Sequence, residues 1–132
     1  MSDEPLHMRE PGIDTGELDV QVDTVDGVEV VRVAGKILSS NVHTLESVVQ
    51  DLIGKEKLQI AFDLTEVPYM SSAGVRVILL CAKSMQKRNG SFALFGLSEY
   101  NMKVFEVAGL HSILPIMPDW EETKRFIESA NG

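Results

Sequence analysis

Alternating apolar and polar residues predict two β-strands near the start of the chain. The runs LDVQVDTV (18–25) and VEVVRVAG (28–35) both show this alternation, which is the period of a strand with one buried face. Asp26 and Gly27 separate the two runs, and both residue types accept the positive φ angles of a tight hairpin turn. We therefore expect an antiparallel hairpin.

Helical and strand-like segments alternate along the rest of the chain. The segment NVHTLESVVQDLIG (41–54) has apolar residues at helical spacing, with Ser39, Ser40 or Asn41 able to cap its start and Gly54 its end. Further strands are predicted at LQIAFDL (58–64), SFALFGL (91–97) and SILPIM (112–117), and further helices at about 72–88, 99–109 and 119–130.

This order of elements predicts an α/β fold. Strands that alternate with helices imply parallel crossover connections, so we expect a mixed sheet: an N-terminal antiparallel hairpin, then parallel βα units, with about four helices. A chain of 132 residues that is 44% hydrophobic can bury one sizeable core. Residues 1–17 are acidic and rich in Pro and Gly, which indicates a flexible acidic tail ahead of a single domain at 18–132.

Charge and cysteine content narrow the classes of partner. The formal net charge of −8 opposes binding to nucleic acid or to an anionic membrane surface. Cys81 is the single cysteine, which excludes an internal disulfide and argues against a cysteine-ligated zinc site. The N-terminal segment has no signal-peptide pattern and no window is long enough for a membrane span. We expect a soluble, cytoplasmic protein with no membrane insertion.

Two adjacent serines mark the junction between a buried strand and an apolar helix in VPYMSSAGVRVILLCAK (67–83). In a structural interpretation, Ser71 or Ser72 caps the helix by accepting one of its unpaired N–H groups. In a functional interpretation, the same N–H groups and the positive end of the helix dipole stabilise a phosphoserine. The residues alone leave both interpretations open.

The helix after these serines is predicted to have two different faces. Gly74, Ile78, Cys81 and Met85 fall on one side, which we expect to face the sheet. The opposite side is formed by Ser72, Arg76, Leu79, Leu80, Lys83 and Lys87. Two leucines within a basic stripe indicate a contact surface for a partner protein. The alternative is a helix buried more deeply on both sides.

Signals for enzyme chemistry are weak. The serines lack a G-x-S-x-G elbow, and no glycine-rich phosphate loop occurs. Asp63 and Glu66 near a strand end are expected to be solvated or capping groups, and Cys81 is expected to be inert packing. The three histidines are His7, His43 and His111. Their spacing does not suit a metal site. We predict no catalytic residue, no cofactor and no metal.

Three segments together resemble a known family: VVRVAGKILSSNVHTLESVV (30–49), IAFDLTEVPYMSSAGVRVILL (60–80) and NMKVFEVAGLHSIL (101–114). Over residues 18–126 the chain resembles the STAS domain of bacterial anti-sigma factor antagonists. The middle segment is the most specific, because family members have an apolar strand ending in Asp-Leu and then a Met-Asp-Ser-Ser/Thr-Gly-like turn. When the two are aligned on Gly74, the family's phosphorylated serine falls on Ser72.

The resemblance implies a partner-switching protein. The unphosphorylated form would bind an anti-sigma factor, itself a serine kinase of the histidine-kinase-like ATPase fold, and so release a sigma factor. Phosphorylation of Ser72 would break this complex and a serine phosphatase would restore it. Ser71 is the second candidate for phosphorylation, and Gly74 would let the partner's backbone approach closely. The predicted partner-binding residues are Leu38, Ser39, Ser71, Ser72, Ala73, Gly74, Arg76, Leu79, Leu80 and Lys83.

Two positions depart from the family pattern. Ser71 stands where the family commonly has an aspartate just before the phosphorylated serine, and Leu38 stands where it commonly has the aspartate of a Gly-x-Leu/Val-Asp motif. These changes leave an alternative: a non-switching STAS subunit of a lipid-transport or stress-signalling complex. Such a subunit would use the exposed helix stripe but not the Ser72 hydroxyl.

Overall fold

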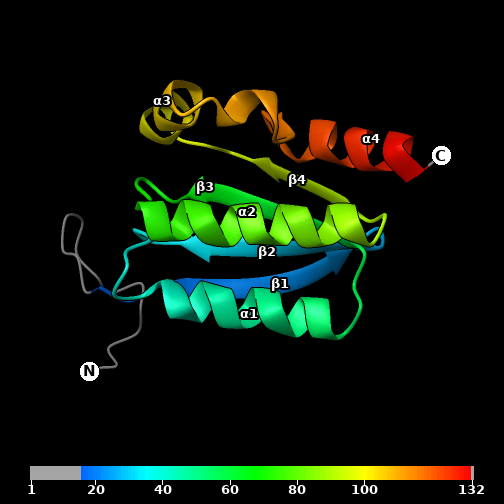
Figure 1. Cartoon of the computed structure of the whole chain (residues 1–132), viewed down its shortest axis with the longest axis horizontal. Coiled ribbons are helices and arrows are strands. Elements are labelled where there is room, and N and C mark those ends of the chain that lie inside the picture. Colours follow the sequence, from blue (N-terminus) through cyan, green and yellow to red (C-terminus); the bar gives the residue numbers. More distant parts are fainter. Residues whose placement is uncertain (1–15, 132) are drawn as a thin grey trace.

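The computed structural model describes residues 16–131 as five strands, four α-helices and a short 3₁₀ helix (Figure 1). The elements are β1 (Asp19–Val25), β2 (Val28–Ala34), α1 (Val42–Gly54), β3 (Gln59–Glu66), α2 (Ser72–Lys87), β4 (Ser91–Phe95), α3 (Glu99–Val107), η2 (Leu110–Ser112), β5 (Ile116–Met117) and α4 (Trp120–Asn131). The predicted acidic tail lies, apart from Gly16 and Glu17, outside the described residues and stays a prediction.

The five strands form one mixed sheet in the order β1-β2-β3-β4-β5. β1 pairs antiparallel with β2, and the later strands pair parallel. Asp26 and Gly27 have φ angles of 52° and 81°, as a tight hairpin turn between the two strands requires. The predicted α/β class, the hairpin and the parallel units are therefore confirmed.

The larger core lies between one face of the sheet and the helices α1, α2 and α3. Side chains of alternate strand positions, such as Val31, Phe62 and Leu94, pack there with Leu45 of α1 and Phe105 of α3. Figure 1 shows α1 and α2 side by side across this face. Because parallel strands end at the same edge of a sheet, the loops after β2 and β3 meet near the start of α2.

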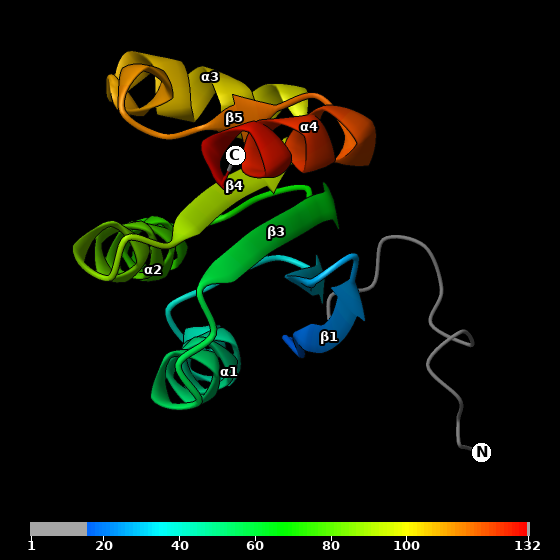
Figure 2. The same cartoon turned by 90° about the vertical axis from the view of Figure 1, so that its right-hand side faces the viewer.

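The opposite face of the sheet is covered only in part. Ile127 of α4 packs there on Val30, Ala61 and Phe95, so that α2 and α4 lie on opposite sides of the sheet (Figure 2). Farther along the same face, Arg32 stands between neighbouring strands without a helix above it, half exposed to solvent. This uncovered part of the sheet is polar.

Several predicted element ends differ from the structure. The strand predicted at 112–117 is reduced to β5, because η2 occupies its start and Pro115 has no N–H group to donate to a ladder. Gly54 is the last residue of α1, and the positive φ angle that follows belongs to Glu56. No side chain caps α1 either. Asn41 stands at its N-cap position, but its side chain makes other hydrogen bonds.

Helix α2 ends at Lys87, close to the end predicted near residue 88. Asn89 adopts a φ angle of 59°, and the N–H of Gly90 donates to the carbonyl of Met85 at 2.7 Å. This is the hydrogen bond by which a left-handed residue closes a helix end. Across residues 16–131, no helix is both long enough and apolar enough to cross a bilayer.

Candidate functional site around the serine turn

Two loops that are distant in sequence are joined directly in front of α2. The N–H of Ile37 donates to the carbonyl of Tyr69 at 3.0 Å, and the N–H of Ser71 donates to the carbonyl of Ile37 at 2.8 Å. These bonds form an isolated parallel bridge between Ile37 and Met70. The structure therefore brings the predicted residues Leu38 and Ser39 close to the serine pair.

The two serines differ in accessibility. Ser71 is the N-cap residue of α2, yet its side chain accepts no N–H group from the helix. Its Oγ is buried and has no hydrogen-bond partner among the described residues. Ser72 is the first residue of the helix and is exposed. The expectation of a serine side-chain cap was thus wrong at Ser71, and Ser72 is the exposed residue of the pair.

Gly74 is buried in the interior of the site. A Cβ on Gly74 would lie 2.7 Å from Cγ2 of Ile37, which is closer than side chains approach without displacing one another. The glycine therefore lets α2 pack on the loop after β2. The expectation that Gly74 admits the backbone of a partner is corrected: its missing side chain makes room for Ile37.

The predicted helix faces agree with the structure except at Leu79. Gly74, Ile78, Cys81 and Met85 are buried, as expected, and Val77 joins them. On the opposite side Arg76 and Lys83 are exposed, and Leu80 is 52% exposed between them. Leu79, in contrast, is half-buried against the core. The basic stripe around an exposed leucine is real, but it contains one leucine and not two.

Asn41 fixes the first loop of the site. Its Oδ1 accepts the N–H of Leu38 at 2.8 Å, and its Nδ2 donates to the carbonyls of Lys36 and Gly16, at 3.0 Å each. Asn41 is 5% exposed, so these bonds satisfy an amide that burial would otherwise penalise. The sequence suggested a helix cap at this position, whereas the residue holds the loop that carries Leu38 and Ser39.

Asn101 of α3 fixes the second loop and was not among the predicted site residues. Its Oδ1 accepts the N–H of Met70 at 3.2 Å, and its Nδ2 donates to the carbonyl of Val67 at 3.0 Å. A signal was present in the sequence: Asn101 precedes Phe105 by one helical turn, so a polar residue falls on the buried face of a helix. Such a residue needs partners from elsewhere in the fold.

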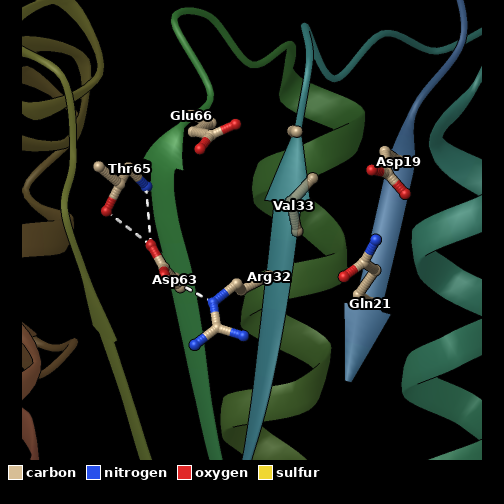
Figure 3. Close-up of a pocket in the computed structure, with 8 residues that line it drawn as sticks. Asp19, Gln21, Arg32, Val33, Asp63, Thr65 and Glu66 are labelled. Atoms are coloured by element: carbon tan, nitrogen blue, oxygen red, sulfur yellow. Dashed lines mark hydrogen bonds and ion pairs between the residues drawn. The ribbon is translucent and has the colours of Figure 1, made fainter. Parts of the chain in front are cut away.

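The uncovered face of the sheet carries a separate polar hollow of about 350 Å³. Figure 3 shows Arg32 directed toward Asp63, whose Oδ1 accepts hydrogen bonds from both the backbone N–H and the Oγ–H of Thr65. The Arg32 Nε lies 3.4 Å from an oxygen of Asp63, so this carboxylate is paired within the sheet. Asp63 is therefore a paired, capping group, which fits the structural role expected for it, and Glu66 lines the same hollow.

Two further kinds of chemistry concern the thiol of Cys81 and clusters of side chains that could hold a metal ion. Burial raises the pKa of the Cys81 thiol to about 12, which leaves the thiol protonated and unreactive at neutral pH. Within residues 16–131, no three His, Cys, Asp or Glu side chains come together in a group able to hold a metal ion.

The chain is similar in sequence to two proteins named as anti-sigma factor antagonists. The chain is 34% identical over 95 residues to BtrV of Bordetella bronchiseptica, provisionally named an anti-sigma factor antagonist, with 72% of this chain and 82% of BtrV covered. It is 35% identical over 86 residues to the anti-sigma-B factor antagonist of Listeria monocytogenes, with 65% of this chain and 75% of the relative covered.

Solved structures and a family model complete the comparison. The anti-sigma factor antagonist SpoIIAA has been solved in its unphosphorylated form, which aligns with a TM-score of 0.65 and 21% identity over 86% of this chain and 99% of SpoIIAA. The phosphorylated form of SpoIIAA aligns with the same TM-score and identity over 80% and 96% of the two chains. The model of the STAS domain matches residues 19–123. The chain therefore belongs to the STAS domain family, among relatives named as anti-sigma factor antagonists.

Proposed function

We propose that this protein is an anti-sigma factor antagonist whose binding is switched by phosphorylation of Ser72. In its unphosphorylated form it binds an anti-sigma factor, a serine kinase of the histidine-kinase-like ATPase fold, and so frees the factor's target. The kinase phosphorylates Ser72 and the complex dissociates, after which a serine phosphatase restores the binding form. Like the relatives named as anti-sigma factor antagonists, the protein is a regulator and not an enzyme.

The contrast between the two serines carries this proposal. A kinase must reach the hydroxyl that it modifies, and Ser72 is exposed whereas the Oγ of Ser71 is buried. The position assigned to the switch by the family resemblance is therefore the accessible one. Replacement of the family's aspartate by Ser71 does not produce a competing phosphorylation site in this conformation.

Electrostatics at the start of α2 supports a stable phosphoserine. A phosphate on Ser72 would stand at the positive end of the helix dipole, where N–H groups of the first turn lack intrahelical acceptors. Arg76 lies one turn along the same face and is exposed, so its guanidinium can pair with the phosphate. The modification would thus change the charge of the surface without unfolding the helix.

The proposed partner surface has Ser72 at its edge. It combines the exposed apolar side chain of Leu80 with the cations Arg76 and Lys83 on the helix, and with the adjacent loop at Leu38 and Ser39. An apolar contact with a charged rim is typical of a transient protein interface. Gly74 and Leu79 support this surface from inside. An added phosphate at its edge would repel acidic groups of the partner. Removing this charged group from water on binding would also cost free energy.

The test is an affinity capture from native lysate with four baits: wild type, Ser72→Ala, Ser72→Asp and Ser47→Asp. Ser47 is an exposed serine of α1, so its variant adds the same charge away from the surface. The proposal expects an ATPase-fold kinase with wild type, Ser72→Ala and Ser47→Asp, and its loss with Ser72→Asp. Retention of the same partners by all four baits would instead identify a non-switching STAS subunit.

A further inference from the structure

The turn that carries the switch serine is held by another helix, namely α3. Val67 and Met70 are both bonded to Asn101, which lies 34 and 31 residues farther along the chain. The Nδ2 of Asn101 donates to the carbonyl of Val67, and its Oδ1 accepts the N–H of Met70. One buried side chain thereby spans the whole turn between β3 and the serine pair.

The remaining residues of the turn contact the same end of α3. The Oγ of Ser98, the N-cap of α3, donates to the carbonyl of Pro68 at 3.3 Å and accepts the N–H of Asn101 at 3.1 Å. The rings of Tyr69 and Tyr100 pack with their centroids 5.6 Å apart. Each of the four residues 67–70 therefore contacts the first turn of α3 or its cap.

Burial makes Asn101 the decisive member of this group. It is 1% exposed, and both ends of its amide are bonded to backbone. The asparagine amide carries its donor and its acceptor on two separate atoms, so one short side chain can bind both backbone groups. Loss of the side chain would leave the N–H of Met70 and the carbonyl of Val67 buried and unpaired, which favours opening of the turn.

Met70, whose N–H is bonded to Asn101, connects the turn to the two serines. Met70 precedes Ser71, whose N–H donates to Ile37 at 2.8 Å, so the turn is held on one side by α3 and on the other by the loop after β2. We propose that Asn101 is a positioning residue that fixes the backbone in front of Ser72 and so sets where the switch hydroxyl is presented. The consequence for phosphorylation rests on the proposed function, whereas the restraint on the turn does not.

The restraint is tested by amide hydrogen exchange on wild type, Asn101→Leu and Thr123→Val. Thr123 is a matched control, because it is fully buried and its Oγ donates to the carbonyl of Asp119 at 2.8 Å, but it lies on α4. We expect the amide of Met70 to exchange at least tenfold faster in Asn101→Leu, relative to the amide of Phe62 in the central strand. Thr123→Val should leave this ratio unchanged. An unchanged ratio in Asn101→Leu would overturn the proposal.

A second variant separates loss of the hydrogen bonds from a general defect in packing. In Asn101→Asp the ionised carboxylate cannot donate to the carbonyl of Val67, but the protonated carboxyl can. We expect the ¹⁵N–¹H signals of Met70 and Ser72 to titrate in this variant and to approach their wild-type positions at low pH. Signals that do not titrate, or that move away from the wild-type positions, would overturn the role assigned to the amide.

The functional consequence is measured with the kinase captured by the wild-type bait. Asn101→Leu should be phosphorylated at least tenfold more slowly than Thr123→Val and wild type. Faster exchange at Met70 combined with a normal phosphorylation rate would overturn the role of Asn101 in the switch. Absence of phosphorylation in wild type would refute the proposed function, and the exchange measurement would still decide whether Asn101 restrains the turn.

Discussion

Gly74 of α2 lies so close to Ile37 that a Cβ on the glycine would stand 2.7 Å from Cγ2 of Ile37. This contact seats α2 on the loop that follows β2. The same loop bonds to Tyr69 and Ser71 through the backbone of Ile37. The position of Ser72 therefore depends on packing beneath α2 as well as on the turn that precedes it.

The first prediction concerns this packing. Gly74→Ala should destabilise the protein by about 1–3 kcal/mol, because the added methyl group displaces Ile37. Gly54→Ala is the matched control: Gly54 is also helical, and nothing lies within 4 Å of its Cβ position. That variant should gain up to about 1 kcal/mol from the higher helix propensity of alanine. Urea unfolding measures both values, and a Gly74→Ala protein as stable as wild type would contradict the packing role.

The second prediction concerns Leu80, the exposed leucine of the basic stripe. Leu80→Gln should change the free energy of unfolding by less than about 0.5 kcal/mol, because Leu80 is largely exposed. The same change should weaken binding of the captured kinase at least tenfold, since an apolar side chain is lost from the proposed interface.

Leu79 provides the opposite case. Leu79→Gln should lower the free energy of unfolding by about 1–2 kcal/mol, because this side chain packs on the core. Calorimetric titration of the kinase into each variant and urea unfolding of each variant check both expectations. Full affinity in Leu80→Gln would remove this residue from the partner surface.

The third prediction concerns the buried thiol of Cys81. Burial raises its pKa from 9.0 to about 12, so between these values the unfolded state loses a proton that the folded state keeps. Stability must then fall as pH rises through this window, by up to about 1.4 kcal/mol per pH unit. Cys81→Ala lacks this contribution.

Unfolding of wild type and Cys81→Ala between pH 8 and pH 11 measures the difference in slope. The stability of wild type should decline more steeply, since all other titrating groups are common to the two proteins. Parallel curves would show that the thiol ionises equally in both states. In addition, the native wild type should resist modification by a thiol reagent at pH 8, a condition in which the unfolded chain reacts readily.

The fold could be predicted from the sequence because its signals are local. Asp26 and Gly27 specify their own turn, and the apolar spacing of α2 identifies its buried face without knowledge of the neighbouring elements. The shortened β5 shows the limit of such patterns. Its apolar residues suit a strand, but Pro115 prevents an early start and η2 takes up the preceding residues.

The site was predicted less completely because its geometry depends on contacts between distant segments. Asn41 was one of three residues predicted as able to cap α1, yet its side chain binds the loop in front of that helix and the carbonyl of Gly16. Asn101 binds a turn 31 residues away. Ser71 and Ser72 are neighbours in the sequence but differ in exposure in the fold. Spacing along the chain does not contain that information.

The central claim is that Ser72 is the switch, and locating the phosphate tests it most directly. The captured kinase is incubated with ATP and either wild type or Ser72→Ala, and fragment-ion mass spectrometry places the phosphate on Ser71 or on Ser72. The account predicts phosphate on Ser72 in wild type and none in the variant. Phosphate on Ser71, or incorporation that persists in Ser72→Ala, would contradict it.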